Sequence, residues 1–154
     1  MVLKILVLIQ KTSKKEKMRK LLKFIALKSF NDGAEKCNQL GKMLIKARKV
    51  DNFLDIGCGD GILSLEYAKF LNAKSIYGVE FVDELIEINK NNGINCIKGD
   101  LNNEWSLESN YFDIILSSQN ITHLNNTSKC LEECYRCLEL GALHNFIRKF
   151  IIYC

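Results

Sequence analysis

From residue 50 onward, short apolar runs alternate with amphipathic stretches. Short runs rich in Val, Ile, Leu and Phe predict buried strands, and longer stretches with apolar positions three or four apart predict helices. The predicted strands are Phe53–Ile56, Ser75–Glu80, Ile94–Ile97 and Phe112–Ser117. The predicted helices are Ile62–Leu71, Asp83–Asn91 and about Ser128–Glu139. This alternation is typical of an α/β fold with a Rossmann-like, doubly wound and mostly parallel sheet.

The first 49 residues follow a different pattern. Met1–Gln10 is a near-continuous apolar run, and Ser13 and Glu16 have the spacing of a capping box that begins a helix. A second helix is predicted over about Ala34–Lys49. We therefore expect an N-terminal helical extension over residues 1–33 and one domain over residues 34–154. A chain of 154 residues, 47% of them hydrophobic, is long enough for one full core.

Charge is divided unevenly along the chain, although the net charge is only +4. Residues 1–50 carry 14 Lys and Arg against 3 Asp and Glu, a balance of +11, whereas residues 51–154 carry 8 against 15, a balance of −7. A basic arm of this kind either binds an anion such as RNA or forms a solvated helix face. Both interpretations stay open on the sequence alone.

The composition also bears on location. No apolar run approaches the roughly 18 residues that a membrane-spanning helix needs, so we expect no membrane span. The apolar run Met1–Gln10 is followed rather than preceded by lysines, and no small-residue cleavage site comes after it. We therefore expect a cytoplasmic protein whose 7 cysteines are reduced.

The segment Asp55-Ile56-Gly57-Cys58-Gly59-Asp60-Gly61 stands where a predicted strand ends and a helix begins. Glycines let the backbone approach a ligand closely, and ligands of open α/β sheets bind at this edge. A dinucleotide fingerprint would need glycine in place of Ile62, and the Gly-Lys-Ser/Thr of a Walker loop is absent. The loop therefore predicts a ligand of another class.

The spacing D-x-G-x-G-x-G resembles motif I of the class I S-adenosylmethionine-dependent methyltransferases. Further motifs of that family follow in the same order, and the resemblance covers about residues 34–142. They are Glu80-Phe81, Gly99-Asp100-Leu101, the strand Tyr111–Ser118, Ile121-Thr122-His123-Leu124 and the turn Leu138–Ala142. Among the branches of the family, the chain looks most like the type-11 methyltransferases.

The resemblance implies S-adenosylmethionine as cofactor and S-adenosylhomocysteine as product. In the family the acid after the second strand binds the ribose, the next residue lines the adenine, and the Asp of the Gly-Asp step accepts from the adenine amino group. The residues implied to bind the cofactor are Asp55, Gly57, Cys58, Gly59, Gly61, Glu80, Phe81, Asp100, Leu101 and Ser117. No catalytic side chain or metal is assigned, because methyl transfer depends mainly on alignment and exclusion of water.

Three of the cysteines have a spacing that allows two interpretations. Cys130, Cys134 and Cys137 have the C-x3-C-x2-C spacing with which radical S-adenosylmethionine enzymes hold an iron–sulfur cluster. The same spacing places the three side chains on one face of a helix, where free cysteine behaves as a small hydrophobe. We expect the second arrangement, because the pattern falls within a predicted amphipathic helix.

The region after the fourth strand limits the methyl acceptor. Amino-directed methyltransferases of adenine or glutamine carry Asn/Asp-Pro-Pro-aromatic there, whereas this chain has Ser117-Ser118-Gln119-Asn120 and no proline. The Pro-Cys pair of cytosine C5 enzymes is also absent. What remains looks like the type-11 branch, which includes small-molecule, lipid-quinone and some RNA methyltransferases. The resemblance therefore implies a small-molecule acceptor, or RNA bound through the basic arm.

The complete family fold has seven strands, and only 13 residues follow Gly141. We expect about five strands in total, in an incomplete methyltransferase fold, although Leu143, Phe146, Ile147, Phe150 and Ile151 also carry helical spacing. Two functions stay open. One is an active methyltransferase, completed by self-association that covers the open sheet edge. The alternative is a truncated, non-catalytic domain that binds cofactor or a partner.

Overall fold

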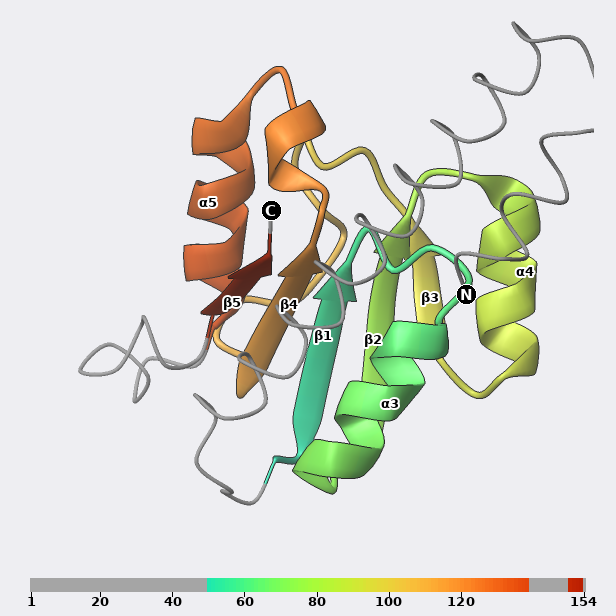
Figure 1. Cartoon of the computed structure of the whole chain (residues 1–154). Coiled ribbons are helices and arrows are strands. Elements are labelled where there is room, and N and C mark those ends of the chain that lie inside the picture. Colours follow the sequence, from blue (N-terminus) through green and yellow to red (C-terminus); the bar gives the residue numbers. More distant parts are fainter. Residues whose placement is uncertain (1–49, 139–149, 154) are drawn as a thin grey trace, which may run out of the picture. The chain divides into compact units, whose positions relative to one another are not determined.

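The computed structural model describes residues 50–138 and 150–153, which all fall within one compact unit spanning residues 40–154 (Figure 1). The predicted extension over residues 1–33, its boundary and the helix over Ala34–Lys49 lie outside the described residues. The elements in chain order are β1 Asn52–Ile56, α3 Ile62–Leu71, β2 Ser75–Glu80, α4 Asp83–Asn91, β3 Asn95–Lys98, β4 Ile114–Ser118, the 3₁₀ turn η1 Ile121–His123, α5 Thr127–Cys137 and β5 Phe150–Tyr153.

The described strands form one parallel sheet in the order β3-β2-β1-β4-β5. The chain runs outward from β1 through β2 to β3, then returns to place β4 on the other side of β1 (Figure 1). The predicted α/β, doubly wound fold is therefore confirmed. In such sheets the crevice beyond the carboxyl ends of the strands, where the direction of winding reverses, is the usual ligand site.

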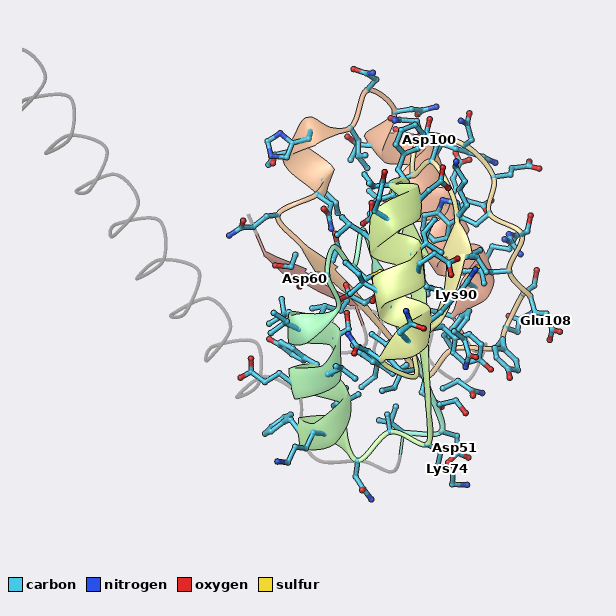
Figure 2. The ribbon with its side chains drawn as sticks, turned by 90° about the vertical axis from the view of Figure 1, so that its right-hand side faces the viewer. Asp51, Asp60, Lys74, Lys90, Asp100 and Glu108 are labelled. Carbon is cyan, nitrogen blue, oxygen red and sulfur yellow. The ribbon has the colours of Figure 1, made fainter. Side chains whose placement is uncertain are left out.

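Helices cover both faces of the sheet. Helices α3 and α4 lie on one face and α5 on the other (Figures 1 and 2). On the α5 face, Leu54, Val79 and Ile115 pack with the helix in the larger core cluster. On the opposite face, Cys58, Ile94 and Cys96 belong to a smaller cluster. Two apolar faces explain why the strands read as continuous apolar runs instead of alternating ones.

The cysteine face of α5 is part of the core. Cys130, Cys134 and Cys137 are each fully buried and pack in the same cluster as the inner residues of β1 and β4. Burial raises the pKa of the Cys137 thiol to about 11, which keeps it protonated at neutral pH. The prediction of a helix face with buried thiols is confirmed.

An ion pair between the buried Glu133 and the half-buried Arg136 holds the segment between β3 and β4 against α5. Glu133 is almost fully buried, and its carboxylate accepts from Arg136 and from the Trp105 backbone amide. Arg136 also donates to the carbonyls of Trp105 and Leu107. Burial would raise the pKa of Glu133, but the hydrogen bonds from Arg136 and the Trp105 amide outweigh it and lower that pKa.

Some element ends differ from the predicted ones for tertiary reasons. β3 begins one residue later than predicted, at Asn95. β4 begins at Ile114, because Phe112 pairs only singly, with Leu138. Leu138 is extended, so α5 ends at Cys137 and not near Glu139.

The last described residues, Phe150–Tyr153, form β5 beside β4. The helical spacing at Phe150 and Ile151 was therefore misleading, and the described residues form a five-stranded sheet, which agrees with the expected about five strands. The other positions of that spacing, Leu143, Phe146 and Ile147, lie outside the described residues.

Candidate functional site

The turn from β1 to α3, residues 57–61, is held in an unusual backbone conformation. Gly57, Gly59 and Gly61 all have positive φ, of 66°, 56° and 79°. A Cβ at Gly57 would overlap the Asn120 side chain, so glycine is needed there for close packing. A Cβ at Gly59 would meet nothing within 4 Å. Gly57 is therefore required by a contact within the protein, whereas the space in front of Gly59 is open.

Glu80, the last residue of β2, anchors this glycine loop. Its side chain is buried, and Oε2 accepts from the Gly59 amide at 2.9 Å. Oε1 accepts from the amides of Phe81 and Val82 at 2.8 and 3.0 Å. An ionised carboxylate offers about four acceptor positions, so this arrangement leaves capacity for another donor on Oε2. Phe81 is 66% exposed beside it, which is unusual for a large aromatic side chain.

Asp55 lies beneath the loop on the α3 face. Its Oδ2 accepts a short 2.6 Å hydrogen bond from the Ser64 hydroxyl, and its Oδ1 is buried with no hydrogen-bond partner among the described residues. Burial raises the pKa of Asp55 to about 7, the Ser64 hydrogen bond opposes this rise, and the nearby Glu80 carboxylate adds to it. A buried carboxylate with an unpaired oxygen is a strong acceptor for a donor that reaches it.

Asp100 follows β3 and is oriented by two asparagines. Oδ1 accepts from both the backbone amide and the side-chain amide of Asn102, at 2.9 and 2.8 Å, and Oδ2 accepts from Asn103. The Asn102 Oδ1 in turn accepts from the amides of Asn125 and Asn126. This network joins the end of β3 to the start of α5 and fixes the carboxylate at the upper, carboxyl end of the sheet (Figure 2).

The turn after β4 completes the site. Gln119 has a φ of 57°, an uncommon conformation for a residue other than glycine. The next residue, Asn120, donates from Nδ2 to the Ile56 and Gly57 carbonyls at 2.6 and 3.2 Å. This contact fastens the end of β4 to the end of β1. Backbone strain of this kind is typical of sites where a side chain must be aimed.

A pocket of about 200 Å³ opens between these elements. It is lined by Gly57, Val79, Glu80, Phe81, Gly99, Asp100, Leu101, Asn120, His123 and Leu124. The structure thus brings together five of the sequence-predicted site residues, from the ends of three strands: Gly57, Glu80, Phe81, Asp100 and Leu101.

The other predicted site residues, Asp55, Cys58, Gly59, Gly61 and Ser117, do not line this pocket. Cys58 is buried, with its thiol 3.7 Å from the Cys96 thiol, and burial raises the pKa of both thiols. Ser117 is fully buried, and its hydroxyl has no hydrogen-bond partner among the described residues. These residues form the support of the loop and of β4 in the structure as it stands.

Asn120 lines the pocket although it was not among the predicted site residues. Its role depends on a contact with the backbone of Gly57, 63 positions earlier in the chain. The segment Ser117–Asn120 and the step Ile121–Leu124 pointed to this turn in the sequence, and His123 and Leu124 do line the pocket.

The comparison with protein families decides the identity of this domain. A family model described as "Methyltransferase domain" matches residues 54–144, well over half of the chain. The chain belongs to this methyltransferase family. The matched residues include every residue that lines the pocket, from Gly57 to Leu124. The predicted family resemblance is therefore confirmed.

Known relatives agree with this assignment. The chain is 30% identical over 111 residues to an uncharacterized methyltransferase of Schizosaccharomyces pombe, a match that covers 64% of this chain and 40% of that protein. The chain therefore spans well under two thirds of the length of that relative.

Solved methyltransferase structures share the fold. A chain from the complex between the Haloferax volcanii Trm112 methyltransferase activator and a candidate methyltransferase aligns with a TM-score of 0.63 at 16% identity, over 74% of this chain and 52% of that one. A TehB-like SAM-dependent methyltransferase of Corynebacterium glutamicum aligns with a TM-score of 0.52 at 25% identity, over 64% and 55% of the two chains. Within the described residues, no helix has the length and apolar character needed to cross a membrane.

Proposed function

We propose that this methyltransferase domain binds S-adenosylmethionine in the pocket at the carboxyl ends of β1, β2 and β3 and transfers its methyl group to an acceptor. One observation carries the proposal: two fixed carboxylates, Glu80 and Asp100, face the same pocket together with the exposed Phe81. A nucleoside with two ribose hydroxyls, an apolar base face and an exocyclic amino group matches this set of acceptors and apolar surface.

Different residues of the pocket would contact the ribose and the adenine of the nucleoside. Glu80 would accept from a ribose hydroxyl with the remaining capacity of Oε2. Phe81 and Leu101 would lie against the adenine, and Asp100 would accept from its amino group. The asparagines that already donate to Asp100 hold its carboxylate in one orientation, which reduces the entropy lost on binding.

The methionine part of the cofactor would lie beyond the pocket, toward the glycine loop and the end of β4. The open space in front of Gly59 leaves room for close approach, and one buried oxygen each of Asp55 and Ser117 has no hydrogen-bond partner among the described residues. An ammonium group near Asp55 would favour its ionised form and lower its pKa. The residues present therefore fit the cofactor at both ends of the proposed site.

When bound, the sulfonium supplies a methyl group that is already activated for transfer. The protein's part is then to align acceptor and cofactor and to exclude water. His123 lines the pocket on an exposed turn, where it could contact an acceptor, but the proposal assigns it no proton transfer. The acceptor is proposed to be a small molecule, or RNA bound through the basic extension of residues 1–33.

If the acceptor is RNA, the affinity of the protein for RNA should depend on salt concentration. Binding through lysines and arginines releases counterions, so the affinity for RNA should fall steeply between about 50 and 200 mM salt. Affinity that is absent or insensitive to salt would leave a small molecule as the proposed acceptor. We also propose a cytoplasmic location. The cytoplasm is a reducing compartment, which suits the five free cysteines of the described residues.

The second candidate function is a cofactor-binding or partner-binding domain without turnover. It is favoured by the similar Haloferax volcanii structure, which is a complex with a methyltransferase activator. In this second candidate function, a protein partner or a second copy of this chain binds the domain. A labelled-methyl assay with lysate fractions separates the two functions, because only the first transfers label.

Calorimetric titration with S-adenosylhomocysteine tests cofactor binding. The variant Gly59→Arg would place a long side chain in the open space before the loop. Gly93→Arg is a matched control, since Gly93 also has a positive φ, of 82°, and open space, but lies in the turn between α4 and β3. Wild type and Gly93→Arg should bind and Gly59→Arg should not. Equal binding by all three would contradict the proposed site.

A further inference from the structure

Asn89 is a fully buried polar residue in α4, the helix that follows the Glu80 strand. Its side-chain Nδ2 donates two hydrogen bonds of 2.7 Å, to the carbonyls of Leu85 and Gly59. The first lies within the same helix. The second crosses to the glycine loop, 30 residues earlier in the chain. Burying an amide side chain costs free energy unless it is hydrogen-bonded. The presence of an asparagine at this buried position therefore needs an explanation.

The two backbone groups of Gly59 are held by two buried side chains. Its amide donates to Glu80, and its carbonyl accepts from Asn89. These groups belong to the peptide planes before and after the Gly59 Cα, so the two contacts together fix the orientation of both planes. Because a Cβ at Gly59 would meet nothing within 4 Å, the residue held in this way is the one that faces open space.

Packing alone does not account for an asparagine at this place. The Asn89 side chain lies directly behind Gly61, where a Cβ would overlap it. Its Oδ1 is buried and accepts no hydrogen bond within the described part of the chain. A leucine of similar volume would fill the same space without an unpaired acceptor. The feature that leucine lacks is the donor to the Gly59 carbonyl.

We infer that Asn89 is a positioning residue of the cofactor site, which holds the Gly59 peptide in its ligand-facing conformation from behind the loop. Asn89 does not line the pocket, so it acts through Gly59 and not by contact with a ligand. The inference rests on the proposed function, because it assumes that the glycine loop approaches the cofactor. It goes beyond that function in assigning a role to the helix after β2.

The test compares full-length wild type with Asn89→Leu and Asn89→Ala, which both remove the donor. Phe112→Leu is the control, since Phe112 is fully buried but packs on Tyr77 and Tyr111, away from the loop. Three quantities are measured: the affinity for S-adenosylhomocysteine, the urea unfolding midpoint, and the hydrogen-exchange rate of the Gly59 amide without ligand. The last one reports the loop directly.

Loss of one hydrogen bond of this kind should weaken the affinity about tenfold and speed Gly59 exchange by a similar factor in both Asn89 variants. Phe112→Leu should lower the unfolding midpoint and leave affinity and exchange near wild type. Asn89 variants that bind as wild type does, or affinity losses that follow the unfolding midpoint in all three variants, would overturn the inference and leave the proposed function standing. Absence of binding by the wild type would overturn the proposed function, and with it the role of Asn89.

Discussion

The Gly59 amide donates a 2.9 Å hydrogen bond to Glu80 Oε2, which joins the glycine loop after β1 to the end of β2. Glu80 therefore has two tasks. It holds the loop in place through three backbone amides, and it presents the remaining acceptor capacity of its carboxylate to the pocket. A substitution at this position should affect stability and ligand binding together.

The substitution Glu80→Gln removes the negative charge of this side chain and nearly keeps its shape. The amide keeps one acceptor oxygen but cannot accept from all three backbone amides, so at least one part-buried N–H group loses its partner. We expect a loss of about 1–3 kcal/mol in unfolding free energy and an affinity for S-adenosylhomocysteine at least about tenfold weaker. Urea unfolding and calorimetry measure the two effects. Wild-type values of both in the variant would contradict the role given to this carboxylate.

The raised pKa of Asp55, about 7, predicts a pH dependence of stability. The folded state holds this proton more tightly than the unfolded chain, so the Asp55 contribution is largest below about pH 4 and is lost as pH rises toward 7. The slope should approach about −1.4 kcal/mol per pH unit between those values.

Asn at position 55 does not titrate, so the difference in unfolding free energy between wild type and Asp55→Asn should change by this slope across pH 5 to 7. The measurement is urea unfolding of both proteins over that range. A difference that stays constant with pH would show that the Asp55 carboxyl titrates at an ordinary pKa.

Arg136→Met tests the ion pair that holds the 101–111 segment on α5. The change leaves the buried Glu133 carboxylate without its main partner and frees the Trp105 and Leu107 carbonyls. We expect a loss of about 2–4 kcal/mol in unfolding free energy. Lys90→Met is the surface control, since both side chains of the Lys90–Glu87 pair are exposed and the pair should contribute little to stability. Equal effects of the two changes would refute the special role of Arg136.

The thiols of Cys58 and Cys96 should react slowly in the folded protein. Both are buried, and burial raises the pKa of each above its ordinary value, which suppresses the reactive thiolate. Iodoacetamide at pH 8 should leave the peptides containing these residues unmodified in the native chain and alkylate them in urea. Rapid labelling of Cys58 in the native chain would show that the glycine loop opens readily.

Most elements of the described fold were predictable because short apolar runs alternate regularly with longer helical stretches. β2, α3 and α4 have the predicted bounds, and the motif order correctly brought Glu80 and Asp100 to one edge of the sheet. Parallel strands place all their carboxyl ends at the same edge, so sequence position was sufficient to predict that convergence.

The roles of Asn89 and Asn120 could not be predicted in the same way. Each makes its decisive contact with the glycine loop, 30 and 63 residues away in the chain. Asparagine at such a position carries no local signal, because its partner is a backbone carbonyl that any residue could supply. The strand at Phe150–Tyr153 was ambiguous for another reason: a short apolar run fits a helix and a strand equally well.

Binding of S-adenosylmethionine between β1, β2 and β3 is tested by a ¹H–¹⁵N titration of the full chain with S-adenosylhomocysteine, which follows the amides of Gly57, Phe81, Asp100, Leu101 and Asn120. We expect saturable shifts concentrated on these amides, with those of Asp51 and Lys74, at the opposite end of the sheet, unchanged (Figure 2). No saturable shift at millimolar ligand, or shifts confined to other residues, would contradict it.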